Sequence, residues 1–318
     1  MVELIKHGVY LLDGQKVVED TTGMPSADEA RENTITYGIL RAHDVNGGKG
    51  KEMHIRFDAM MSHDITYVGI IQTARASGLT KFPLPYAMTN CHNSLCAVGG
   101  TINEDDHVFG LSAAKKYGGI YVPANQAVIH QYAREAMVKC GNMILGSDSH
   151  TRYGALGTMA VGEGGPELAK QLLRHTWDAD LPEVVLVYVT GTPRRGVGPH
   201  DAAIALVKAT FASSFVKNRV LEFAGPGVTS LPMDYRIGID VMTTETACLS
   251  SIWETDGTVK EYLTIHGRPD EYKRLSPDEG ACYDGMITID LSSVEPMAAL
   301  PFHPSEAVTL RELMANPG

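Results

Sequence analysis

The chain has 318 residues and a formal net charge of −11, and 44% of its residues are hydrophobic, 20% charged and 7% aromatic. This composition excludes a disordered chain, and the length is typical of about two domains. Because the charge is negative and no run of Lys or Arg exceeds two residues, we expect no nucleic-acid partner. No stretch approaches the roughly 20 apolar residues of a membrane span, so we expect no membrane contact.

The five cysteines indicate reduced thiols. Their number is odd, and the N-terminal run MVELIKHGVYLLDG lacks the charged-then-apolar pattern of a secretory signal. We therefore predict a cytoplasmic location. We interpret the cysteines as packed thiols and not as a metal or cluster site, because no C-x-x-C occurs.

Taken in chain order, the sequence predicts short apolar strands that alternate with helices. A hairpin over 8–18 and a helix from Ser26 to about Leu40 come first. A helix is then predicted between each consecutive pair of five strand segments, which are HIRFDAMM, PYAMT, IYVPA, NMILG and EVVLVYVTG. This alternation predicts a largely parallel α/β sheet with helices on both faces.

The segment GTPRRGVGPHD (191–201) is dense in Gly, Pro and charge and is predicted to separate two domains. We predict a first α/β domain over 1–192, a linker over 193–200 and a second, smaller α/β domain over 201–318. The second domain is predicted to contain one long helix over IGIDVMTTETACLSSIW (237–253). The expected fold class is α/β, with two layered α/β/α domains and largely parallel sheets.

The run LGSDSHTRYGALG (145–157) is the first candidate site. It follows a predicted strand and therefore leaves the sheet at the carboxyl edge, where open α/β folds bind ligands. In an extended chain Asp148 and His150 point the same way and Ser149 the other. An Asp–His pair can act as an acid–base unit, because the carboxylate orients and tunes the imidazole. The alternative is that Asp148 and Ser149 cap the turn while His150 is solvated.

Glu245 is the second candidate, because it falls on the apolar stripe of the helix predicted over 237–253. A carboxylate on a core-facing side costs several kcal/mol of desolvation unless it is paired or protonated, so we predict a functional role. The alternative is a helix rotated so that Glu245 lies at a rim.

Three further stretches give weak signals. His130 lies at the edge of an apolar helix face, and its pattern alone indicates a rim histidine. The stretch NCHNSLC (90–96) offers His92 and Asn93 after a strand end. His63, in SHD, is interpreted first as part of a helix start.

The chain as a whole resembles the aconitase family of hydro-lyases. GSDSHT is similar to the G-T-D-S-H-T motif of that family, and further segments are similar to family segments in the same order, from about residue 55 to about residue 305. These are DITYVGIIQTARASGL, AVIHQYARE, AVGEGGPELA, EVVLVYVTG, EFAGPGV, TTETACLSSIW and YDGMITIDLSSVEP. The stretch NCHNSLC is similar to that of an aconitase-like hydratase branch. The resemblance implies the fold of the first two aconitase domains.

The resemblance also implies roles for individual residues. It implies that His130 pairs with Asp148, that Ser149 and His150 lie near the substrate, and that Glu245 faces the substrate hydroxyl. The predicted catalytic residues are therefore His130, Asp148, His150 and Glu245, and the predicted substrate-binding residues are His63, His92, Asn93, Ser149 and Arg152.

Several of these positions depart from the family. His92-Asn93 stands where the family usually has Asp-His, which puts ordinary aconitase activity in doubt. His63 stands where many members have a glutamine, and Arg152-Tyr153 follows S-H-T in place of Pro-Asn. Arg152 is a candidate for holding a carboxylate and, equally, for a surface arginine.

The resemblance implies a [4Fe-4S] cluster held by three cysteines, in a Cys-Thr-Asn stretch and a C-x-x-C, and neither occurs here. We therefore expect the cluster cysteines beyond Gly318, on C-terminal domains or a companion subunit, and no cofactor on this chain alone. The predicted function is the N-terminal part of an iron–sulfur-dependent hydro-lyase or isomerase for a hydroxy di- or tricarboxylic acid, inactive alone. Two alternatives remain open: a non-catalytic binding or scaffold module of the same fold, and a metal hydrolase that uses His130, Asp148 and His150.

Overall fold

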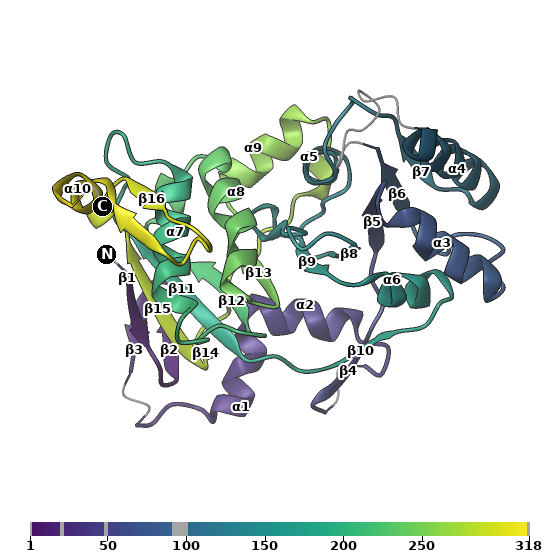
Figure 1. The fold of residues 1–318 in the computed structure, drawn as a ribbon. Helices are drawn as coiled ribbons and strands as arrows, with labels where there is room; N and C mark the ends of the chain where they lie inside the picture. The colour runs from purple at the N-terminus through teal and green to yellow at the C-terminus, as the bar shows by residue number, and fades with distance from the viewer. Residues whose placement is uncertain (1, 20–21, 48–49, 91–100, 317–318) are drawn as a thin grey trace.

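The computed structural model describes residues 2–19, 22–47, 50–90 and 101–316, and within these ranges the chain forms two five-stranded sheets with helices packed around them (Figure 1). The predicted α/β fold class with largely parallel sheets is confirmed. None of the helices in these ranges combines the length and the apolar character that a membrane span requires.

The first sheet is parallel throughout, in the order β7-β6-β5-β8-β9. Its central strands are continuous apolar runs that are buried along their whole length, as expected for a parallel sheet covered on both faces. The strands are β5 (Ala59–His63), β6 (Tyr86–Thr89), β7 (Ile120–Val122), β8 (Met143–Gly146) and β9 (Met159–Gly162). The helices between them are α3 (Tyr67–Ala76), α4 (Thr101–Tyr117) and α5 (Ile129–Ala136), and α6 (Gly165–Leu172) follows β9.

The second sheet has the order β1-β15-β11-β12-β13, in which only the edge strand β1 runs antiparallel. Its strands are β1 (Val2–Ile5), β11 (Val184–Thr190), β12 (Val220–Ala224), β13 (Ser250–Trp253) and β15 (Gly285–Asp290). The helices packed with it are α2 (Ile35–His43), α7 (Pro199–Thr210), α8 (Met233–Met242) and α9 (Gly257–Ile265).

Three small antiparallel units complete the described chain. They are the pair β4 (Glu52–Ile55) with β10 (Trp177–Asp180), the group β2 (Val9–Leu12), β3 (Lys16–Val18) and β14 (Ala281–Tyr283), and the hairpin β16 (Met297–Ala299) with β17 (Ala307–Thr309). The short helices α1 (Ala27–Ala30) and α10 (Leu310–Ala315) lie near the two ends of the chain. Figure 1 shows both termini beside the second sheet.

Sheet membership does not follow the boundary predicted at 193–200. Strands β1 and β11 lie within the range assigned to the first domain, yet both pair with strands of the second sheet. The Gly- and Pro-rich segment is the loop between β11 and α7, at the carboxyl end of a strand. Loops at that position have the same composition as linkers, so local sequence does not distinguish the two.

The long helix predicted over 237–253 is wrong. Helix α8 ends at Met242, a 3-10 turn η5 (Thr243–Thr246) follows, and Ser250–Trp253 is strand β13. Ala247 ends the turn with a left-handed backbone at φ 62°, a conformation that stops a helix. The apolar residues of the predicted stripe therefore lie in a helix, in the segment that follows η5 and in a strand.

The two sheets meet where the segment after β8 lies against β13. Gly154, in the 3-10 turn η3 (Gly154–Leu156), lies so close to β13 that a Cβ atom there would be 2.3 Å from the Ser251 carbonyl oxygen. The buried carboxylate of Asp240 joins the same elements, because it accepts hydrogen bonds from the Trp253 indole (2.9 Å) and from the Ala155 amide (3.2 Å). This junction fixes the run 145–157 against the second sheet.

Candidate active site

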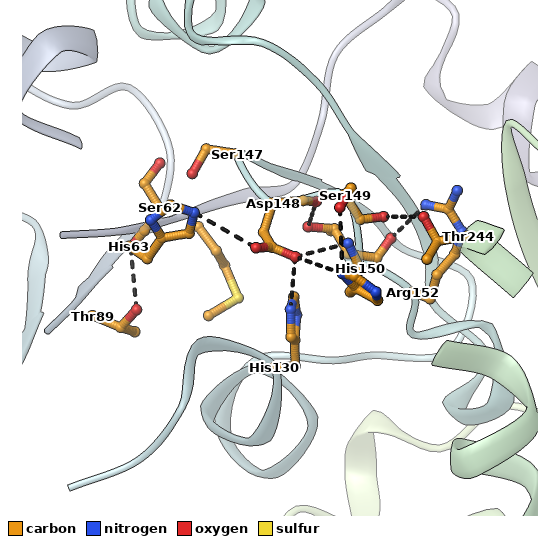
Figure 2. Close-up of polar contacts among 12 residues, drawn as sticks. Ser62, His63, Thr89, His130, Ser147, Asp148, Ser149, His150, Arg152 and Thr244 are labelled. Atoms are coloured by element: carbon orange, nitrogen blue, oxygen red, sulfur yellow. Dashed lines mark hydrogen bonds and ion pairs between the residues drawn. The ribbon is translucent and has the colours of Figure 1, made fainter. Parts of the chain in front are cut away.

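Polar side chains from both sheets converge at the carboxyl edge of the first sheet (Figure 2). His63 is the last residue of β5, so the segment interpreted as a helix start is a strand end. Asp148 and His150 follow β8, and His130 lies in the first turn of α5. Glu245 comes from the other side, in the turn η5 that precedes β13.

Asp148 is the centre of this group. Its Oδ1 atom lies 3.0 Å from His130 Nε2 and accepts the backbone N–H of His150 at 2.7 Å. Its Oδ2 atom lies 3.6 Å from His63 Nε2, and the residue is only 7% exposed. Figure 2 shows the carboxylate with His63 on one side and His130 and His150 on the other.

The electrostatic balance keeps Asp148 ionised. Burial raises the pKa of this carboxyl, but hydrogen bonds from His130 and from the side chain and backbone of His150 outweigh it, so the pKa lies well below its usual value. The carboxylate therefore stays negative across the neutral range and orients both imidazoles.

His130 is the neutral imidazole of the site. Burial lowers its pKa below 6.5, against the opposing effect of Asp148. Its Nδ1 atom lies 3.2 Å from the Tyr153 hydroxyl. The network is satisfied when Nε2–H donates to Asp148 and Nδ1 accepts from Tyr153, which assigns the tautomer.

His150 has the opposite tendency. The hydrogen bond to Asp148 raises its pKa, burial opposes this effect, and the nearby Glu245 raises the pKa further. Its Nε2 atom lies 3.1 Å from Glu245 Oε1, and its side chain is 41% exposed. His150 is thus the most exposed imidazole around Asp148 and carries a proton more readily than a free histidine does.

Glu245 lies at a rim and not in the core, since its side chain is 26% exposed. The turn that carries it is tied to the first sheet by the Thr244 hydroxyl, which donates to the Ser149 carbonyl at 2.6 Å. Glu245 is therefore brought to His150 by the junction between the sheets, and not by a helical stripe.

The remaining predicted residues differ in position. Ser149 is exposed beside the site, with Oγ 3.3 Å from His150 Nδ1. Arg152 is buried, and its guanidinium donates at 2.9 Å to the carbonyls of Thr151 and Cys248. In this conformation Arg152 ties the loop to the second sheet, so a role in holding a substrate carboxylate stays a prediction. His92 and Asn93 lie outside the described residues.

Sequence reasoning missed His303. Its Nε2 atom lies 3.7 Å from Glu245 Oε2, and its ring stacks on Phe211 with the ring centroids 4.0 Å apart. No motif or periodicity marks this residue, which reaches Glu245 only through the path of the loop between β16 and β17.

The described residues do not fit an iron–sulfur cluster. Cys140 and Cys248 are buried in two different connecting segments, and Cys282 is buried in β14. Among the residues that the structure describes, no group of three or more His, Cys, Asp or Glu side chains is arranged to hold a metal ion. Cys91 and Cys96 lie outside the described residues. A cluster of the complete enzyme is therefore not assigned to this part of the chain.

The fold and the site define an α/β protein with a cluster of imidazoles and carboxylates at a sheet edge. Comparison with known proteins identifies the family: the model of the aconitase family (aconitate hydratase) matches residues 37–318. The chain belongs to the aconitase family. The resemblance seen in the sequence is thereby confirmed, and with it the hydro-lyase family for which the relatives below are named.

Three curated relatives illustrate the match. The 3-isopropylmalate dehydratase large subunit of Elusimicrobium minutum is 34% identical over 63% of this chain and 48% of its own length. The aconitase–ribosomal protein bL21m fusion protein of Schizosaccharomyces pombe is 32% identical over 64% of this chain and 23% of its own. A putative mitochondrial aconitate hydratase of Aspergillus fumigatus is 28% identical over 90% and 38%. The chain thus spans about half or less of the length of these relatives.

Proposed function

We propose that this chain is the N-terminal part of a hydro-lyase or isomerase that removes water from, and adds water to, a hydroxy di- or tricarboxylic acid. The observation that carries the proposal is the convergence of Asp148, His130, His150 and Glu245 from two sheets on one edge. The relatives named 3-isopropylmalate dehydratase and aconitate hydratase support the substrate class.

Dehydration needs a base to take a proton from carbon and an acid to protonate the hydroxyl, because hydroxide is a poor leaving group. The raised pKa of His150 makes it the proton donor of the described group. Glu245, 3.1 Å from His150, favours the charged form of that imidazole. We propose that the base that takes the proton from carbon comes from the rest of the complete enzyme. Once that base holds the carbon proton, His150 has given its proton to the leaving oxygen and the C–O bond has broken, the products are water and an unsaturated acid.

The inner residues position this donor. Ionised Asp148 holds His150 from one side and His130 from the other, and the lowered pKa of His130 leaves a neutral ring that does not compete for the carboxylate as a second cation. We propose that Ser149 and His63 bind the substrate at the two ends of this group, where the exposed hydroxyl and the buried imidazole lie.

The complete enzyme needs more than this chain. The family implies a [4Fe-4S] cluster in complete enzymes, and we propose that its cysteines and further substrate-binding groups come from C-terminal domains or a companion subunit. The relatives support this, since the chain matches 48% or less of the three described above. A cytoplasmic location also stays a proposal, and the name of the Aspergillus relative places that protein in mitochondria.

The test is to assay the purified 318-residue chain alone and together with the remaining family domains, against a panel of hydroxy di- and tricarboxylic acids. The readout is the ultraviolet absorbance of the unsaturated product. We expect turnover only from the combined protein. Turnover by the chain alone would refute the division of labour, and no turnover by either would refute the hydro-lyase.

A scaffold or binding module of the same fold is the second candidate, and His92-Asn93 in place of the family's Asp-His favours it. Unchanged metabolite conversion on substitution of Glu245 by Gln in the complete protein would support this candidate. The metal hydrolase has less support, because Oδ1 of Asp148 lies 3.0 Å from His130 Nε2 and 3.5 Å from His150 Nδ1, so both imidazoles face the carboxylate and not a common ion.

A further inference from the structure

His303 reaches the site from the far end of the described chain. The hairpin of β16 and β17 packs against α7, and the loop between its strands carries His303. This residue touches Glu245, the only predicted catalytic residue that the second sheet contributes among the described residues. The loop therefore adds a contact to the proposed acid–base group.

The imidazole of His303 is fixed in place and in tautomer. Its ring stacks on Phe211, the C-cap residue of α7, with an interplanar angle of 27°. Its Nδ1 atom accepts the backbone N–H of Ser305 at 3.1 Å, so the proton of the neutral ring is on Nε2. That Nε2 atom lies 3.7 Å from Glu245 Oε2, which is close enough for an electrostatic contact but longer than a hydrogen bond.

The Glu245 carboxylate thus lies between two imidazoles. Oε1 lies 3.1 Å from His150 Nε2, and Oε2 lies 3.7 Å from His303 Nε2. A glutamate that is 26% exposed would otherwise sample several rotamers, and fixing such a side chain costs conformational entropy. An imidazole held beside the outer oxygen removes part of that freedom before the substrate binds.

We propose that His303 is a positioning residue, which holds the outer oxygen of Glu245 so that the inner oxygen stays on His150. Only the expected effect of His303 on turnover rests on the proposed function. The contact between His303 and Glu245 is a property of this chain. His150 is the reporter, because the described titratable groups that act on it are Asp148, Glu245 and His130.

The experiment is an NMR titration of the imidazoles in the 318-residue chain, for wild type, His303→Ala, His303→Gln, Glu245→Gln and His266→Ala. We expect the titration midpoint of His150 to fall by roughly half a unit in Glu245→Gln, because the negative charge beside the imidazole is removed. It should fall by a smaller amount in His303→Ala, because the Glu245 carboxylate is then free to leave His150. In His303→Gln, which keeps an N–H group, the His150 midpoint should fall less than in His303→Ala.

His266 provides a matched control. Its ring also packs against an aromatic ring, that of Tyr262, with 4.3 Å between the ring centroids, and it lies 4.0 Å from the carboxylate of Glu135 on α5. His266→Ala should leave the His150 midpoint unchanged. A His303→Ala midpoint equal to that of wild type overturns the proposal, and so does the absence of a shift in Glu245→Gln.

In the complete protein, His303→Ala should lower kcat several-fold and shift its pH profile, with little change in KM. His266→Ala should change none of these. An NMR shift without any dehydratase turnover by the wild type would leave the positioning role standing and refute the proposed function. An NMR shift with wild-type kcat and pH profile in His303→Ala would overturn the catalytic part of the inference.

Discussion

The Oε1 atom of Glu245 lies 3.1 Å from Nε2 of His150, although the two residues belong to different sheets and are 95 positions apart. The contact depends on the junction at which the segment after β8 lies against β13, because neither sheet alone places a carboxylate at that imidazole. The geometry of the proposed acid–base group is therefore also a measure of how the two sheets pack.

Substitution of Glu245 by Gln in the complete protein should lower kcat/KM about a hundredfold or more, since general acid–base groups contribute about 10²- to 10⁴-fold. The amide keeps the shape but loses the charge that helps raise the pKa of His150. Initial rates of formation of the unsaturated acid measure the effect. The exposed Glu261 on α9 provides the control, and Glu261→Gln should retain full activity. Equal rates for the two variants would contradict the role of Glu245.

The pH dependence of folding tests the charge state of His150. Its pKa is raised in the folded chain, so its stabilisation is fully present below about pH 6.5, the ordinary value, and is lost as the pH rises through the folded pKa. His150→Gln should therefore lower the free energy of unfolding more at pH 6 than at pH 9. Because the side chain is 41% exposed, we expect a difference below about 1 kcal/mol.

The measurement is urea denaturation at the two pH values, repeated in an Asp148→Asn background. Asp148 is the largest cause of the raised pKa, so the pH-dependent difference should shrink there. A difference that persists in full without the carboxylate would show that another group governs His150.

The sequence predicts the first sheet well because its strands are continuous apolar runs, and the position of Asp148 follows from the rule that parallel strands present ligands at their carboxyl ends. The pairing of β1 with β15 was not predictable, because strand partners nearly 290 positions apart leave no local pattern. The sequence does not mark the end of α8, because no Gly or Pro follows Met242 and the left-handed Ala247 ends only the 3-10 turn after it.

Within the site, too, local patterns are predictable from the sequence and contacts between distant segments are not. Asp148 and His150 are close in sequence, and a local turn after β8 sets their geometry, because the Asp148 side chain accepts the backbone N–H of His150. His303 is near Glu245 only because a loop more than 50 residues further along the chain folds back. Tertiary contacts of this kind are set by packing of the whole chain and have no signature in a single stretch.

Gly154 tests the junction between the sheets. A Cβ atom at this residue would lie 2.3 Å from the Ser251 carbonyl oxygen, which is backbone and cannot move aside cheaply. Gly154→Ala should lower the free energy of unfolding by roughly 1 to 3 kcal/mol or more, measured by urea denaturation. Gly38→Ala is the matched control, because Gly38 lies in α2 with no atom within 4 Å of the added Cβ, and it should stabilise the chain by about 0.5 to 1 kcal/mol. Equal stabilities for the two variants would mean that the sheets do not approach so closely.

Glu222 tests how the second sheet supports Glu245. This carboxylate is fully buried in β12, and it accepts the amides of Ile35 and Thr36 at 3.0 and 2.9 Å, together with the hydroxyls of Thr36 and Tyr283 at 2.6 and 2.8 Å. Burial raises its pKa while these donors oppose the rise. The side chain thereby satisfies the N-terminus of α2 from the middle of a strand.

Glu222→Leu should lower the free energy of unfolding by several kcal/mol, because each buried donor left unpaired costs about 1 to 3 kcal/mol. Glu222→Gln should cost less, since its amide oxygen still accepts part of the set. The exposed pair of Glu183 with Arg219 provides the control, and Glu183→Gln should cost below about 1 kcal/mol. Because β12 pairs with β13, next to the turn that carries Glu245, Glu222→Leu should also lower the His150 titration midpoint before global unfolding. A Glu222→Leu chain as stable as Glu183→Gln would show that α2 does not depend on this carboxylate.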